Sequence, residues 1–280
     1  MLFDTHCHLI HKNYKKSPEE VIKSAEQAGV DLFLNIGTSL KENESAIELA
    51  EKHKNVFCAV GITPDEDMNL SLTEIENSLR EQIKKSKKVV AVGECGIDVS
   101  GLQKIRDLKF QIELFEMQVK LAVEFNLPLI IHNRNGDEQV LAVAEKYAKQ
   151  GSPSRKATAE RKLTGVAYCF VQDWDYAQKM LGYGFYLGFG GIITYSPSSA
   201  SWRTTEGHSI LETVKKAPGN RILIETDSPY LAPGNLRRSI NEPKNIGLVA
   251  QKIAETRGIS YDEVCKLTYE NGKTLFGINR

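Results

Sequence analysis

The sequence lacks an excess of either charge and lacks any long apolar run. Lys plus Arg and Asp plus Glu both total 36, so the formal net charge is zero. No global electrostatic field therefore attracts nucleic acid, an acidic partner or a membrane surface, and any polyanion binding must be local. No apolar run approaches the roughly 20 residues of a membrane-spanning helix, so we expect no membrane association.

Cysteine is scarce and irregularly spaced. The five cysteines are odd in number, and no two of them form a C-x-x-C pair. This pattern argues against a disulfide framework and against a zinc ribbon. The N-terminus has no signal-peptide pattern, because Asp4 and His6 interrupt it before an apolar region forms. We therefore expect a protein of the reducing cytoplasm, and no obligate protein partner is indicated.

What the sequence does contain is a regular alternation of short β-rich runs with longer amphipathic runs. Eight such pairs within 280 residues predict an α/β fold, a distorted (β/α)8 TIM barrel with an extra C-terminal helix, as a single domain over 1–280. The expected strands are 1–8, 31–38, 56–62, 89–95, 127–132, 165–170, 185–189 and 221–227. The expected helices are 18–28, 41–54, 72–87, 104–126, 137–150, 174–182, 208–217, 243–257 and 261–276. Ser17 followed by Pro18 is typical of a helix start.

Polar residues of one chemical kind end several of the expected strands. His6 and His8 end the first strand, and they point the same way because successive side chains of a strand alternate between its faces. Glu94, His132 and Asp227 end the fourth, fifth and eighth strands. Imidazole and carboxylate groups bind divalent ions, and the catalytic residues of a barrel gather at the carboxyl ends of its strands. These five residues predict a metal site, with unrelated buried polar groups as the alternative.

Four motifs carry a resemblance to a known family: Phe3-Asp-Thr-His-Cys-His8, Gly93-Glu-Cys-Gly-Ile-Asp98, Ile131-His-Asn-Arg134 and Glu225-Thr-Asp-Ser-Pro-Tyr-Leu-Ala-Pro233. Through them the chain resembles, nearly end to end, the TatD-type deoxyribonucleases among the metal-dependent amidohydrolase-like barrels. The resemblance implies a hydrolase that cleaves DNA or a small phosphodiester, exonucleolytically in the case of DNA. It also implies two ions bridged by Glu94. The first would be bound by His6, His8, Glu94 and Asp227, and the second by Glu94, His132 and a histidine of the sixth strand.

The sequence departs from the family pattern at three positions near the mouth of the expected barrel. Tyr168 stands where the family has the sixth-strand histidine, and a neutral phenol with a pKa of about 10 is a poor metal ligand. We therefore expect one firmly bound ion and a doubtful second site, with Zn, Mn, Mg, Ni and Fe as candidates. Thr63 replaces a histidine that contacts the phosphate or nucleophile region, and Val99 replaces an aromatic residue.

These departures leave two alternatives to a deoxyribonuclease open. One is a mononuclear amidohydrolase or deaminase that acts on a small molecule, since the same barrel supports that chemistry. The other is a weakly active or non-catalytic binding homologue that has lost the working residues at Tyr168 and Thr63.

Catalytic and substrate-binding roles follow from the resemblance and from side-chain chemistry. Asp227, next to a metal-bound water, is the expected proton acceptor, and Glu94 would hold or bridge the ions. Arg134, two residues beyond His132, could clamp a phosphate or form a salt bridge on the rim. Arg237 stands where the family has an Arg-Gly pair and could also reach phosphate, although the glycine is missing.

Other polar residues are expected to have accessory roles. Asp98 and Glu242 would orient ligands or loops. Trp202, in the long loop after the seventh strand, could stack on a base or act as a packing anchor. We expect surface or capping roles for the histidines that end no strand: His11, His53 and His208.

Overall fold

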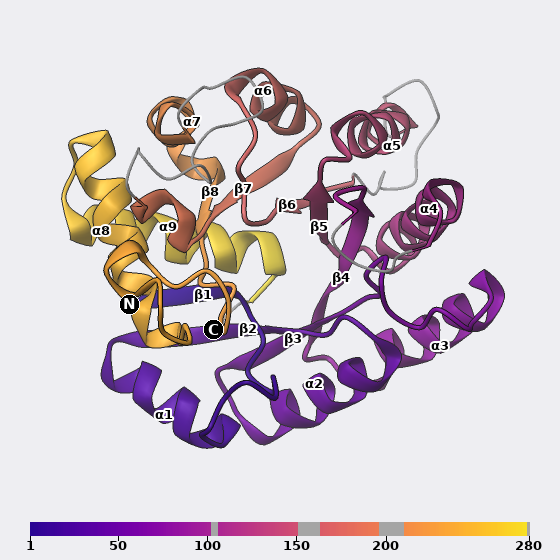
Figure 1. Cartoon of the computed structure of the whole chain (residues 1–280), viewed down its shortest axis with the longest axis horizontal. Coiled ribbons are helices and arrows are strands. Elements are labelled where there is room, and N and C mark those ends of the chain that lie inside the picture. Colours follow the sequence, from indigo (N-terminus) through magenta and orange to yellow (C-terminus); the bar gives the residue numbers. More distant parts are fainter. Residues whose placement is uncertain (102–105, 151–162, 196–209, 279–280) are drawn as a thin grey trace. The chain divides into compact units, whose positions relative to one another are not determined.

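The fold is that of a (β/α)8 barrel, as the alternating pattern predicts. The computed structural model describes residues 1–101, 106–150, 163–195 and 210–278. Eight strands alternate with helices along the chain and are hydrogen-bonded in chain order, from β1 to β8, in one sheet (Figure 1). The pairs β1–β2, β3–β4, β4–β5, β5–β6 and β7–β8 are parallel. Parallel strands joined by helices in sequential order are the TIM-barrel topology.

The bounds of most elements lie within three residues of the expected ranges. The strands are β1 Leu2–Cys7, β2 Val30–Ile36, β3 Val56–Val60, β4 Val89–Asp98, β5 Leu129–Arg134, β6 Gly165–Ala167, β7 Phe185–Phe189 and β8 Ile222–Ile224. The α-helices are α1 Pro18–Gln27, α2 Leu40–Lys52, α3 Leu72–Lys85, α4 Leu108–Phe125, α5 Asp137–Gln150, α6 Trp174–Gly182, α7 Ile210–Lys216, α8 Ile246–Arg257 and α9 Tyr261–Phe276. Short 3-10 helices are η1 Gly191–Thr194, η3 Gly219–Arg221, η4 Gly234–Leu236 and η5 Pro243–Asn245. The helix α9 confirms the expected extra C-terminal helix.

Local capping explains why the helix starts could be predicted. The Ser17 side chain accepts a hydrogen bond from the Glu20 backbone N–H, and the Glu20 carboxylate accepts one from the Ser17 N–H. Pro18 occupies the first helical position, where its missing N–H costs no hydrogen bond. The same reciprocal box, between Ser71 and Glu74, begins α3.

The chain forms two compact units, each with its own buried contacts. The first comprises Met1–Asn35, Tyr168–Gln178 and Tyr186–Arg280, and the second comprises Ile36–Ala167 and Lys179–Phe185. In the first unit α9 packs on β1 and β8, and in the second α2, α3 and α4 lie along β3 and β4. The expectation of a single domain stays a prediction. Among the helices of the described ranges, none combines the length and hydropathy needed to cross a membrane.

The strands β6 and β8 are shorter than predicted, with three residues each. Beyond β8, the backbone N–H and the hydroxyl of Thr226 donate to the buried carboxylate of Asp4. Asp227 follows with a left-handed backbone, at φ 52°, and its N–H donates to the His6 carbonyl at 2.9 Å. Side-chain hydrogen bonding thus ends the strand early, and Asp227 belongs to the turn after β8 instead of ending the strand.

Candidate metal centre

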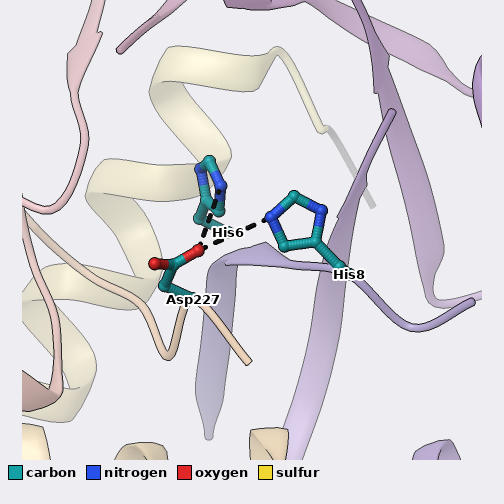
Figure 2. Close-up of side chains that lie close together, drawn as sticks. All are labelled: His6, His8 and Asp227. Atoms are coloured by element: carbon teal, nitrogen blue, oxygen red, sulfur yellow. Dashed lines mark ion pairs between the residues drawn. The ribbon is translucent and has the colours of Figure 1, made fainter. Parts of the chain in front are cut away.

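Two histidines and one carboxylate converge in the first unit. His6 lies in β1 and His8 directly follows it, and both side chains point to Asp227 (Figure 2). Asp227 Oδ1 lies 3.7 Å from His6 Nε2 and 3.5 Å from His8 Nε2. One ligand atom of each residue lies within 4.8 Å of the other two, and no other group of three such ligands occurs among the described residues. All three are buried, and this donor set fits the divalent ion that the sequence implies.

Asp4 connects the two chain segments that carry these side chains. Its carboxylate accepts from the His6 N–H at 3.3 Å, from the Thr226 N–H at 3.0 Å and from the Thr226 hydroxyl at 2.6 Å. Burial raises the pKa of Asp4 to about 7, although the hydrogen bonds from Thr226 act in the opposite direction. The buried carboxyl group therefore sets how β1 meets the turn of Asp227.

A second polar group lies in the second unit, around His132. The Nδ1 atom of His132 lies 2.9 Å from Glu94 Oε1, and its Nε2 lies 3.8 Å from Asp98 Oδ2. Burial lowers the pKa of His132, but the neighbouring carboxylates of Asp98 and Glu94 outweigh burial and raise it to about 9. Burial likewise raises the pKa of Asp98, but the nearby His132 imidazole and the hydrogen bond from Ser100 hold it well below its usual range. The imidazole position thus favours a positive charge, which a proton or a bound ion can supply.

Of the five expected ligands, three therefore belong to the first unit and two to the second. His6, His8 and Asp227 lie together in the first, and Glu94 and His132 lie together in the second. The expectation that Glu94 bridges two ions stays a prediction.

Two of the three positions that depart from the family pattern, Tyr168 and Thr63, have clear surroundings. Tyr168, just past β6, stacks on His6 with ring centroids 3.8 Å apart and an interplanar angle of 16°. Thr63, just past β3, is buried, and its N–H donates to the Thr38 carbonyl at 3.0 Å. Thr63 is thus part of a loop contact within the second unit.

The two arginines expected to bind substrate are exposed. Arg134 ends β5 in the second unit. Arg237 directly follows η4 in the first unit, and its guanidinium lies 4.6 Å from the centroid of the Tyr195 ring. A cation over an aromatic face is held in a defined direction.

The accessory residues have more varied positions. Glu242 forms ion pairs with Lys16 at 2.8 Å and with Lys244 at 3.2 Å, so it connects the segment before α1 with η5. His53 is the C-cap of α2, as expected. Two expected sites lie outside the described residues: Trp202 and His208.

One pairing was missed by sequence reasoning, because His11 was expected at the surface or in a cap. Its Nε2 lies 2.9 Å from the hydroxyl oxygen of Tyr230, and its Nδ1 accepts from the Asn13 N–H at 3.1 Å. Because Nδ1 is an acceptor, the neutral ring carries its proton on Nε2 and donates it to Tyr230. The Tyr230 ring is 47% exposed and meets His8 edge-on at 6.0 Å. The available signal was position, since His11 and Tyr230 each follow an expected ligand by three residues.

Comparisons with known proteins indicate one family over nearly the whole chain. The sequence profile of the family described as "TatD related DNase" matches residues 3–277. The chain is 33% identical to the uncharacterized metal-dependent hydrolase YabD of Bacillus subtilis over 100% of both proteins. It is 30% identical to the 3'-5' ssDNA/RNA exonuclease TatD of Erwinia amylovora, over 99% of this chain and 100% of that protein. Among solved structures, the TatD homolog YJJV of Escherichia coli gives a TM-score of 0.85 at 25% identity, covering 99% of this chain and 98% of that one.

Proposed function

Because the chain belongs to the family of TatD related DNases, and is thus a metal-dependent hydrolase, we propose that it is a nuclease that cleaves phosphodiester bonds of single-stranded DNA from an end. The observation that carries the proposal is the buried group of His6, His8 and Asp227. The choice of substrate is supported by the relative that is named a 3'-5' ssDNA/RNA exonuclease.

The three side chains suit hydrolysis by an activated water. A divalent ion bound there would polarise the phosphate and lower the pKa of water from 15.7 toward about 7. Both imidazoles lie near Oδ1 of Asp227, so Oδ2 is the atom that can accept the proton of the attacking water. His6 has no exposed surface, so its Nε2 is shielded from bulk water and keeps its direction.

Phosphate binding would be local, since the chain has no net charge. We assign it to the two exposed arginines, Arg134 and Arg237. A guanidinium presents its donors in a planar fork that matches phosphate oxygens. The Arg237 guanidinium lies over the Tyr195 ring, which restricts the directions that its fork can take.

One firmly bound ion per chain is part of this proposal. The described residues contain one group of three ligands, and Tyr168 stands at the family's histidine position with its ring against His6. The same observation supports a second candidate function, a mononuclear amidohydrolase or deaminase acting on a small molecule.

The test uses metal-free protein reloaded separately with Mg²⁺, Mn²⁺ or Zn²⁺, and single-stranded DNA labelled at either end. The expected result is stepwise shortening from one end with at least one metal, together with metal analysis near one ion per chain. His6→Ala is the control that removes a ligand. No cleavage above this control with any metal would contradict the proposal, and hydrolysis of small amides without DNA cleavage would favour the second candidate.

A further inference from the structure

The Tyr168 ring lies flat on the imidazole of His6, and we propose that Tyr168 is a positioning residue for this metal ligand. It acts through the face of its ring, and the inference rests on the metal centre of the proposed function. The ring centroids are 3.8 Å apart and the planes differ by 16°. Both residues belong to the first compact unit, as do His8 and Asp227.

The backbone directly after Tyr168 is held by two hydrogen bonds. The Cys169 N–H donates to the carboxylate of Glu225, which is fully buried, and Cys169 has a left-handed backbone with φ 45°. The Phe170 N–H donates to the Gly188 carbonyl at 2.9 Å. A Cβ at Gly188 would lie 2.4 Å from Glu225 Oε2 and 3.2 Å from Tyr168 Cα, so only glycine leaves room for this arrangement. These contacts fix the backbone next to Tyr168, and with it the position of the Tyr168 ring against His6.

A ring stacked on a histidine ligand restricts rotation about the last torsion of that side chain, the one rotation that the ligand retains in a packed core. An imidazole binds an ion in its own plane, and the last torsion of a histidine side chain has broad minima. Rotation about that bond would move Nε2 out of line with Asp227 Oδ1, which lies 3.7 Å away. The face of Tyr168 thus selects the ring plane of His6. The His8 ring packs on His6 in a T-shaped arrangement, with centroids 5.2 Å apart and planes at 72°.

The first measurement is metal affinity, by competition of Zn²⁺ with a coloured chelator. Tyr168→Phe keeps the ring and should bind as the wild type does. Tyr168→Leu removes the ring and should bind about tenfold more weakly, the lower end of losses for outer-shell partners. Phe170→Leu is the matched control, since Phe170 is a buried ring that packs on Phe189 and Tyr176. It should lower thermal stability and leave metal affinity unchanged.

The second measurement is made on metal-free protein by NMR of histidine-labelled samples. The ring protons of His6 should be shifted upfield in the wild type and in Tyr168→Phe, because they lie over an aromatic face. This comparison does not require Tyr168→Leu to fold.

Several results would overturn the proposal. These are a Tyr168→Phe affinity as weak as that of Tyr168→Leu, an unchanged Tyr168→Leu affinity, an equal loss in Phe170→Leu, no upfield shift of His6, or no metal binding by the wild type. None of these measurements uses nucleic acid. A wild type that binds Zn²⁺ without cleaving DNA would therefore contradict the proposed nuclease activity. The metal affinities of the Tyr168 variants would still decide the role of Tyr168.

Discussion

Single residues at the candidate centre derive their roles from neighbours distant in sequence. Tyr230 is an example, because its hydroxyl is held by His11 and its ring stands half exposed beside His8. In the nuclease proposed above, this exposed ring would serve as a stacking platform for a nucleobase. Sequence reasoning identified Tyr230 as part of a motif but could not identify His11 as its partner. No local pattern connects positions that are 219 residues apart.

We predict that Tyr230→Ala weakens binding of single-stranded DNA by about tenfold, since stacking contributes about 1–3 kcal/mol per base. Tyr230→Phe should lose far less, because it retains the ring. Fluorescence anisotropy with a labelled oligonucleotide in chelator, where the strand is not cut, measures both variants. Tyr261→Ala is the matched control, because Tyr261 is also exposed but lies at the start of α9. An equal loss in Tyr261→Ala, or in Tyr230→Phe, would contradict a stacking role.

At the scale of elements, helix α4 anchors the ends of two strands through a pair of glutamines. Gln111 accepts from the Asp98 N–H at 2.9 Å and donates to the Asp98 carbonyl at 3.1 Å. Gln118 does the same for Ile62, with both bonds at 2.9 Å. Residues seven apart share one face of a helix. The helix therefore satisfies backbone groups of Asp98, the last residue of β4, and of Ile62, just past the end of β3.

We predict that Gln111→Leu and Gln118→Leu each lower the free energy of unfolding by about 2–4 kcal/mol, because each leaves a buried N–H and a buried carbonyl unpaired. Urea denaturation measures the change. Gln251→Leu, at an exposed position of α8, is the control and should change stability by less than about 0.5 kcal/mol. Losses as small as that control would mean that the paired backbone groups find water or other partners.

The accuracy of sequence-based prediction for each element has a physical cause. The helices α1 and α3 begin at the capping boxes of Ser17 and Ser71, and α9 spans the expected 261–276. These are signals within one turn of helix, so a sequence shows them directly. The ends of β6 and β8 were predicted too late, because Glu225 and Asp4 provide hydrogen-bond acceptors to the following residues. Such contacts come from distant segments, as does the stacking of Tyr168 on His6.

At the scale of the whole molecule, the candidate ligands join the beginning of the chain to a turn near its end. His6 and His8 belong to β1 and the residue after it, and Asp227 follows β8, yet all three lie in the first compact unit. An ion that binds the folded state alone stabilises it by mass action, by about 2.7 kcal/mol at a concentration 100 times the dissociation constant. Metal removal should therefore lower the free energy of unfolding by an amount that depends on metal concentration.

We predict that this stabilisation is larger in the first unit than in the second. Saturation with Zn²⁺ should slow amide hydrogen exchange at Asp227 and His8, whose N–H groups bond to the carbonyls of His6 and Ser228. The amide of Asp98 in the second unit, which is bonded to Gln111, should change less. Exchange measured by mass spectrometry with and without chelator tests this, and His6→Ala should lose the difference. Equal slowing in both units would mean that the ion is bound by residues of both. In that case Glu94 and His132 are the first residues to replace in further variants.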